Sequence, residues 1–207
     1  MNTNQHLENL SEIRNIMERS TKFISLSGLS GVSAGVIALI GSYIAYTKIN
    51  TNRTSNDHVL NITEATSKEL FILGIAILVF ALIFGSLFTI IKAKKRSDLT
   101  WNAASKKLFI NISIPLVAGG VFCLALMKYG FFGLIAPTTL IFYGLGCINA
   151  SHHTLSDIRY LGLLNLSIGL INLFFIGYGL LFWAFGFGVL HIVYGTIMYI
   201  KYDMKKV

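Results

Sequence analysis

Charged side chains are scarce in this chain and are missing from the middle of its long apolar runs. Of its 207 residues, 13% are charged and 54% are hydrophobic, whereas a soluble domain carries about 25% charged residues. A transmembrane helix needs about 20 mainly apolar residues, so we expect an all-α, polytopic membrane helix bundle. Its six predicted transmembrane helices are Phe23–Tyr46, Phe71–Ile91, Leu108–Met127, Phe131–Ala150, Tyr160–Ile176 and Leu180–Ile200.

Few residues offer catalytic or metal-binding chemistry. The two cysteines, Cys123 and Cys147, have no second cysteine or histidine at ligand spacing within their helices, unlike common zinc and haem motifs. No span contains the Asp or Glu that ion-coupled transporters commonly use. The span Phe131–Ala150 also lacks the serine that a rhomboid-type intramembrane protease needs. We therefore predict no catalytic residue, no metal site, no cofactor and no enzymatic activity.

The polar segments are too short to form a separate domain. Residues 1–22 precede the predicted transmembrane domain 23–200, and residues 201–207 follow it as a cytoplasmic tail. Within 1–22, apolar side chains recur at helical spacing, which predicts a short amphipathic helix on the cytoplasmic side. These side chains are Leu7, Leu10, Ile13 and Met17.

The basic residues are distributed unevenly between the predicted loops. Thirteen Lys and Arg residues lie in the N-terminal segment, the second and fourth connections and the tail, against four in the other connections. Basic loops stay in the cytoplasm, so both termini are predicted to be cytoplasmic, as an even number of spans also requires. Because the net charge of +8 is concentrated beside span ends, we expect it to face lipid phosphates rather than nucleic acid.

Short repeated patterns suggest three related helical hairpins. Tyr129-Gly130 and Tyr178-Gly179 fall in the predicted outer turns, and Ser156-Asp157 resembles two other cytoplasmic Ser-acid pairs that precede helices. A Ser oxygen caps free backbone N–H groups, and an acid in the first turn opposes the helix dipole. Shared capping chemistry without duplication explains the same pattern. Pro115 and Pro137 lie inside the third and fourth spans, where we expect each to bend its helix.

Two sets of residues within the spans are candidate functional positions. Ser27, Gly31 and Gly35 form a ridge of small residues on the first span, which we expect to pack within the chain, with homodimerisation as the alternative. The second set is a polar cluster on the last hairpin, where counting from the inner ends places His191 level with Gly169. It is either a structural hydrogen-bonding group or a small cavity that binds a ligand. Its members are Asn165, Asn172, His191 and Tyr194.

Two stretches of the chain resemble a family. Leu10–Val32 (LSEIRNIMERSTKFISLSGLSGV) and Gly177–Tyr199 (GYGLLFWAFGFGVLHIVYGTIMY) are similar to an uncharacterised family of small bacterial multi-pass membrane proteins. The resemblance covers under a quarter of the chain. It implies location in the bacterial inner (cytoplasmic) membrane and no particular activity.

Two functional hypotheses follow from these observations. The first is a non-enzymatic accessory or regulatory membrane component that packs against itself or a membrane-protein partner within the lipid bilayer. The second is a carrier or channel for a small neutral or apolar molecule, which would use the polar stripe between the last two spans. A lipid-modifying enzyme is third, because no catalytic constellation supports it. The sequence contains no motif that names a ligand or a partner.

Overall fold

The computed structural model describes residues 27–51, 64–95 and 103–204, and all regular structure in these ranges is helical. The predicted amphipathic segment 1–22 and residues 205–207 of the tail lie outside the described residues. The α-helices are α2 (Gly28–Thr51), α3 (Glu64–Lys95), α4 (Ala103–Lys128), α5 (Ile135–Ala150), α6 (Asp157–Asn172), α7 (Gly179–Trp183) and α8 (Leu190–Met198). Short 3-10 turns are η1 (Phe132–Leu134), η2 (Ser151–His153) and η3 (Ile176–Tyr178), and π-helical segments are η4 (Ala184–Val189) and η5 (Tyr199–Asp203).

Several described helices are long and apolar enough to span a membrane, which makes the chain a membrane protein. Five segments meet this description: Gly28–Thr51, Lys68–Lys94, Ala103–Lys128, Phe132–His153 and Ile176–Asp203. The remaining helix, α6, has 16 residues and is about 24 Å long, less than the hydrocarbon thickness of about 30 Å. It ends at Asn172 rather than at the predicted Ile176 because the chain turns there. Helix length therefore supports five spanning helices, one fewer than the sequence predicted.

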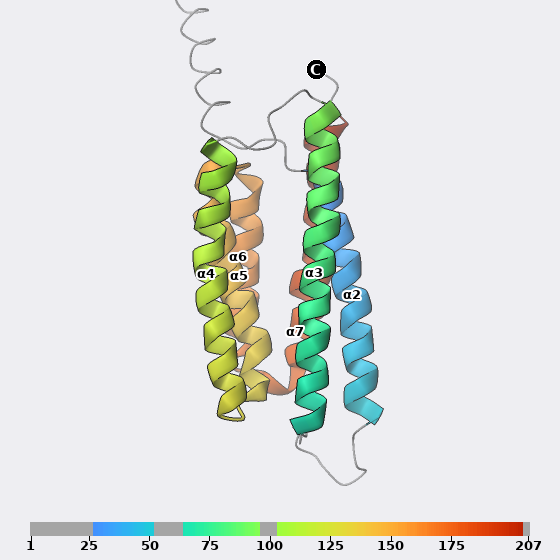
Figure 1. The fold of residues 1–207 in the computed structure, drawn as a ribbon, viewed down its shortest axis with the longest axis vertical. Coiled ribbons are helices and arrows are strands. Elements are labelled where there is room, and N and C mark those ends of the chain that lie inside the picture. The colour runs from blue at the N-terminus through green and yellow to red at the C-terminus, as the bar shows by residue number, and fades with distance from the viewer. Residues whose placement is uncertain (1–26, 52–63, 96–102, 205–207) are drawn as a thin grey trace, which may run out of the picture.

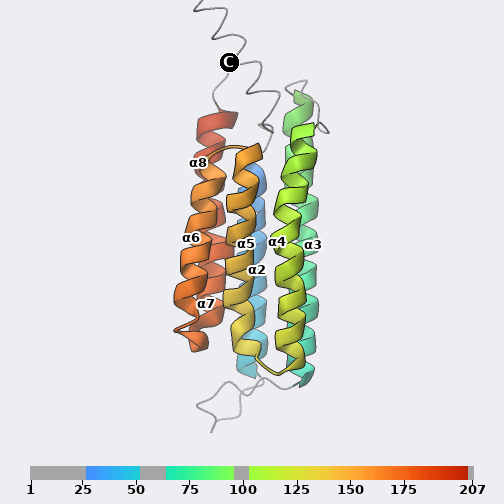
Figure 2. The same cartoon turned by 90° about the vertical axis from the view of Figure 1, so that its left-hand side faces the viewer.

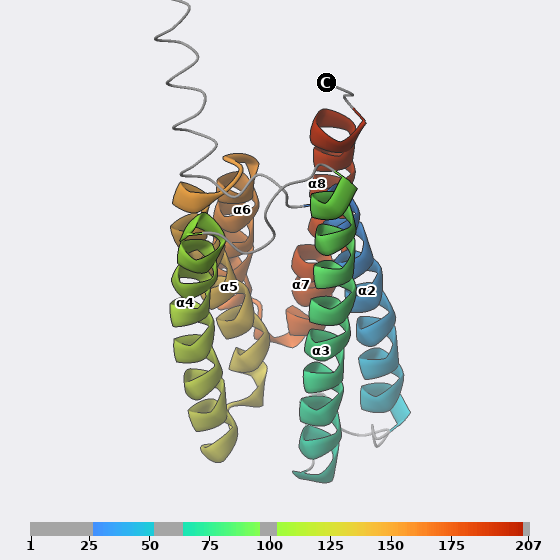
Figure 3. The same ribbon diagram turned by 45° about the horizontal axis from the view of Figure 1, so that its top comes forward.

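The helices form two groups that lie side by side along the length of the molecule (Figures 1 and 3). The first half contains α2, α3 and the last helix, which we define as the continuous run of α7, η4, α8 and η5. The second half contains α4, α5 and α6. In Figure 2 the α4–α5 and α6–α7 turns lie at the opposite end from the C-terminus. The two halves meet where α5 and α6 contact the last helix.

Small residues on α2 allow it to pack closely against the last helix. A Cβ atom on Gly31 would lie 3.1 Å from the Cα of Gly195, and one on Gly35 would lie 2.7 Å from the carbonyl oxygen of Gly188. Such spacing brings helix backbones into direct contact in membranes. Part of the predicted ridge, Gly31 and Gly35, therefore packs against this chain's own last helix.

Asp203 connects three helix ends. Its Oδ2 accepts hydrogen bonds from the backbone N–H of Gly28 at 3.1 Å and from the hydroxyl of Ser27 at 3.3 Å. Its Oδ1 lies 2.7 Å from Nζ of Lys92, and the two side chains are only 11% and 9% exposed. A carboxylate at a helix N-terminus satisfies free N–H groups and opposes the dipole. Asp203 thus holds the start of α2 and the end of α3 against the end of the last helix.

Two local predictions were wrong. Pro137 is the third residue of α5, where a backbone N–H has no acceptor within the helix, so the proline removes no hydrogen bond. Pro115, in contrast, lies inside α4. Ser156 precedes α6 but makes no capping hydrogen bond through its side chain. Its neighbour Asp157 instead accepts hydrogen bonds from Lys201 Nζ at 3.0 Å and from the Tyr202 hydroxyl at 2.7 Å.

Candidate functional site

His191 lies where the two halves meet and contacts both of them through hydrogen bonds. Its side chain is buried, with 7% of the residue exposed. Nδ1 lies 3.0 Å from the carbonyl oxygen of Gly186, and Nε2 lies 2.6 Å from the hydroxyl of Tyr143 on α5. Because a carbonyl oxygen can only accept, Nδ1 carries the proton. In the neutral ring Nε2 therefore accepts from the Tyr143 hydroxyl, which joins α5 to the last helix.

The π-helical segment η4 places Gly186 beside α6. A Cβ atom on Gly186 would lie 2.7 Å from Oδ1 of Asn165. On another side of the same segment, Gly188 packs against Leu39 of α2. The absence of side chains at Gly186 and Gly188 therefore lets η4 fit between α2 and α6. Single turns of π-helix occur often at functional sites.

Asn165 and Asn172 lie on one face of α6, and both are completely buried. Nδ2 of Asn165 donates to the carbonyl oxygen of Leu161 at 3.0 Å. Oδ1 of Asn165 and both amide atoms of Asn172 have no hydrogen-bond partner among the described residues. Oδ1 of Asn172 points toward Gly179, whose Cβ position is 3.8 Å away. An amide without a partner in an apolar medium costs about 2–7 kcal/mol, so these atoms are the least satisfied polar groups of the junction.

The structure brings together part of the predicted polar cluster. Asn165 and His191 converge on Gly186 from two sides, and Asn172 lies farther along α6, beside Gly179. Tyr194 is half-buried and close to Asp157 and Tyr160, and no hydrogen bond described here joins it to the asparagines or to His191. Asn165 and His191 therefore meet at Gly186, whereas Asn172 lies apart from them on the same face of α6 and Tyr194 lies at the margin.

The sequence-based depth of His191 was wrong. We expected it between Asn165 and Asn172, but Asn165 faces Gly186 and Asn172 faces Gly179. His191 follows both glycines and so lies nearer the end that carries Asp203. The estimate assumed a uniform α-helical rise in both helices, whereas the last helix contains the π-helical segments η4 and η5.

Tyr143 is the functional candidate that the sequence reasoning missed. Its ring packs against Phe187 at a centroid distance of 5.0 Å and against His191 at 5.2 Å, and Trp183 extends the aromatic group at 4.9 Å from Phe187. A tyrosine in the middle of an apolar span was the available signal, because its hydroxyl needs a partner there.

Replacing Tyr143 with phenylalanine is expected to lower the stability of the folded chain by about 1–3 kcal/mol, because Nε2 of the buried His191 loses its donor while the ring contacts remain. Thermal unfolding in a mild detergent, followed by circular dichroism, measures this change. Tyr43→Phe is the matched control, since Tyr43 is 69% exposed on α2. Equal melting temperatures for both variants would show that the Tyr143 hydrogen bond does not stabilise the junction.

Metal-ligating side chains do not gather in the described part of the chain. Within it there is no group of three or more His, Cys, Asp or Glu residues that could hold a metal ion. Cys123 is half-buried and Cys147 is buried, and both are free thiols. The polar groups of the junction are thus amides, an imidazole and a phenol, which are suited to hydrogen bonding with a neutral molecule.

Comparison with known proteins identifies no family and no function for this chain. No family model, no curated protein and no solved structure matches the chain. The resemblance of Leu10–Val32 and Gly177–Tyr199 to a bacterial membrane-protein family therefore stays a prediction.

Proposed function

We propose that this chain is a carrier in a bacterial inner membrane that binds a small neutral molecule between its two halves. Asn172 is the observation that carries the proposal, because its whole amide is buried without a partner among the described residues. Together with Oδ1 of Asn165, it offers one donor group and two acceptors along a single face of α6. Polar groups of this kind within a membrane commonly mark a substrate path.

The chemistry of the junction favours a neutral substrate. Asn165 and Asn172 have no charge, and the one described titratable side chain that contacts Gly186, His191, is already hydrogen-bonded on both nitrogens. A charged molecule would lose its hydration without meeting a counterion, which is costly in an apolar medium. The proposed substrate is therefore a small neutral molecule that both donates and accepts hydrogen bonds, carried without coupling to an ion.

We further propose six membrane crossings with both termini in the cytoplasm. The described cations Lys92, Lys94, Lys106, Lys107, Arg159 and Lys201 lie in the helix ends grouped near the C-terminus. The opposite end carries Lys48, Lys68 and Lys128. Retention of basic ends in the cytoplasm supports this orientation. In this topology α6 is the fifth of six spans along the chain and is short, and the three helical hairpins share one direction, as related repeats would.

An accessory role through helix packing is the second candidate. The predicted ridge does not favour it, because Gly31 and Gly35 are covered by the last helix. The exposed surface of α3 favours this candidate. α3 packs mainly on α2, and no residue in its most apolar 18-residue window is buried. A helix of a second copy or of a membrane-protein partner would fit that open surface. Purification of a stable complex without solute uptake would support this candidate.

Asn172→Leu separates the two candidates. We expect uptake of a neutral solute into proteoliposomes to fall by about tenfold or more, because one or two hydrogen bonds to the substrate are lost. Thermal stability should stay equal or rise, because leucine removes an unpaired amide from an apolar site. Urea, acetamide and glycerol are suitable probes, with uptake followed by stopped-flow light scattering.

Asn111→Leu is the matched control for this experiment. The amide of Asn111 donates to the carbonyl oxygen of Lys107 in its own helix, and the residue is half-buried on α4, so uptake should be unchanged. If Asn172→Leu lowers stability and leaves uptake unchanged, the asparagine is structural and the carrier proposal fails. Absence of uptake by the native chain for every neutral probe would also contradict it.

A further inference from the structure

Exposed aromatic side chains cover the two turns at the end of the molecule opposite the C-terminus. We call this surface the aromatic tip; it consists of Tyr129 and Phe131 in the α4–α5 turn and Phe174, Phe175 and Tyr178 in the α6–α7 turn. All five side chains are more than half exposed, and Phe174 reaches 85%. The two turns touch, since a Cβ atom on Gly133 would clash with the side chain of Ile176. The tip is therefore formed by two turns that are in contact.

The charge on the aromatic tip is typical of a surface that faces lipid headgroups. Residues 128–134 and 173–179 contain no acidic residue and one cation, Lys128. Nζ of Lys128 lies 5.9 Å from the centre of the Tyr129 ring. Tyrosine and lysine at helix ends are enriched at the membrane interface, where rings lie at headgroup level and ammonium groups reach the phosphates.

Most backbone N–H groups of the α6–α7 turn are hydrogen-bonded within the chain. The N–H groups of Leu173, Phe174, Phe175 and Tyr178 donate to carbonyl oxygens of Gly169, Ile171, Asn172 and Phe175 at 2.9–3.3 Å. Gly179 N–H donates to the carbonyl oxygen of Ile176. Non-helical backbone is costly at membrane depth because unpaired groups lack water. A turn with most of its donors paired internally can lie below the water surface.

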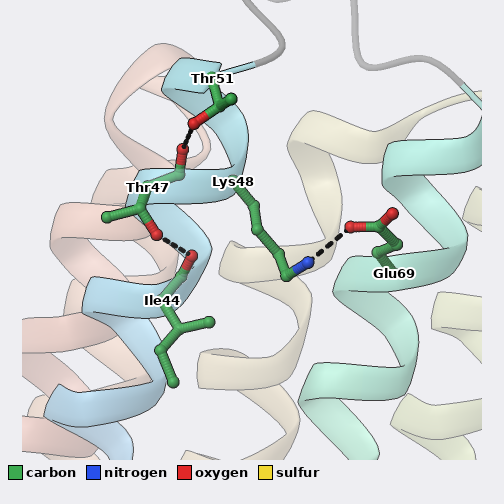
Figure 4. Close-up of polar contacts among 5 residues, drawn as sticks. All are labelled: Ile44, Thr47, Lys48, Thr51 and Glu69. Atoms are coloured by element: carbon green, nitrogen blue, oxygen red, sulfur yellow. Dashed lines mark hydrogen bonds and ion pairs between the residues drawn. The ribbon is translucent and has the colours of Figure 1, made fainter.

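The C-terminal end of α2 and the N-terminal end of α3 are polar, unlike the aromatic tip. There Lys48 Nζ lies 2.7 Å from Oε2 of Glu69, both side chains are about half exposed, and Thr47 and Thr51 bond to their own helix (Figure 4). An exposed ion pair of this kind is typical of water. The two halves therefore end in different surroundings on the same side of the membrane.

We propose that the aromatic tip is inserted into one leaflet of the bilayer, at the boundary of headgroups and acyl chains, and binds phospholipid there. The α6–α7 turn then does not reach bulk water, whereas the α2–α3 end does. The short α6 fits this position, because a helix of about 24 Å cannot cross a hydrocarbon layer of about 30 Å without ending near or below its boundary. This inference is independent of the carrier proposal.

Cysteine labelling in lipid vesicles tests the inserted tip. Phe174→Cys and Thr51→Cys would each be made in the full chain, reconstituted in phosphatidylcholine and phosphatidylglycerol, and treated with a charged maleimide on both sides of the membrane. The reagent on both sides makes the result independent of orientation. We expect Phe174→Cys to react at least about tenfold more slowly than Thr51→Cys, and both to react equally after denaturation in SDS. The native chain, with Cys123 and Cys147, gives the background.

A second position and a second measurement guard against a local effect. Tyr178→Cys should be protected like Phe174→Cys. In Phe174→Trp, the added fluorescence should be quenched by lipid brominated near the headgroup more than by aqueous iodide. Equal labelling of Phe174→Cys and Thr51→Cys in vesicles would overturn the proposal and place the tip in water, as a surface for a protein partner.

Discussion

Replacing Gly195 with alanine is expected to destabilise the folded chain by about 3 kcal/mol, which corresponds to a fall in melting temperature of about 10 °C. A Cβ atom on Gly195 would lie 2.5 Å from the backbone nitrogen of Val32 and 2.7 Å from the carbonyl oxygen of Gly28. Both are backbone atoms, so no side chain can rotate away and α2 must move off α8. Thermal unfolding in a mild detergent measures the loss.

Gly120→Ala is the matched control for Gly195→Ala. Gly120 lies inside α4, and a Cβ atom there would meet nothing within 4 Å. Alanine is favoured over glycine in a helix by about 1 kcal/mol, so this variant should be as stable as the native chain or slightly more so. If Gly195→Ala and Gly120→Ala have the same melting temperature, α2 does not pack closely against the last helix at Gly195.

Removing the carboxylate of Asp203 is expected to lower the free energy of unfolding by about 3–5 kcal/mol, because this is the usual effect of removing one partner of a buried ion pair. Asp203→Ala takes the carboxylate away from Lys92, whose side chain is only 9% exposed. The same change removes the acceptor for the N–H of Gly28 and the hydroxyl of Ser27. The expected result is a chain whose α2 and α3 separate from the last helix at lower temperature or lower SDS concentration.

A double-mutant cycle shows whether loss of the Lys92–Asp203 ion pair causes the lower stability. Asp203→Leu combined with Lys92→Met should recover part of the stability lost by Asp203→Leu alone, because no buried charge is left without its partner. Lys48→Ala supplies the matched surface pair, since Lys48 and Glu69 are 41% and 52% exposed and such pairs contribute about 0–1 kcal/mol. Additive effects of the two buried substitutions would mean that Lys92 and Asp203 do not interact.

The lengths of the apolar runs predicted most of the helices. A segment that crosses hydrocarbon must pair its backbone N–H and C=O groups within the segment, and a helix does this. The predicted span Tyr160–Ile176 is the exception, since α6 ends at Asn172. The chain continues apolar through Phe174 and Phe175, and composition does not distinguish an apolar turn from an apolar helix. Only the backbone hydrogen bonds of the turn separate the two.

The candidate site was partly predictable. Asn165 and Asn172 were found because polar side chains seven residues apart share one helix face, and a buried amide is conspicuous in an apolar span. Tyr143 was not found as the partner of His191, because that pair depends on how α5 and the last helix are aligned. The π-helical segment η4 changes this alignment, and periodicity in one helix carries no information about the height of its neighbour.

The sequence by itself determined that this chain is a helical membrane protein, since hydrocarbon accepts only segments with this composition and length. It also determined which side chains are polar within the spans. Only the tertiary structure decided that Gly28, Gly31 and Gly35 of α2 face the last helix, that Asp203 joins three helix ends, and that His191 bonds to Tyr143. These contacts join residues far apart in the chain, and close packing of helix backbones at Gly31, Gly35, Gly188 and Gly195 brings them together.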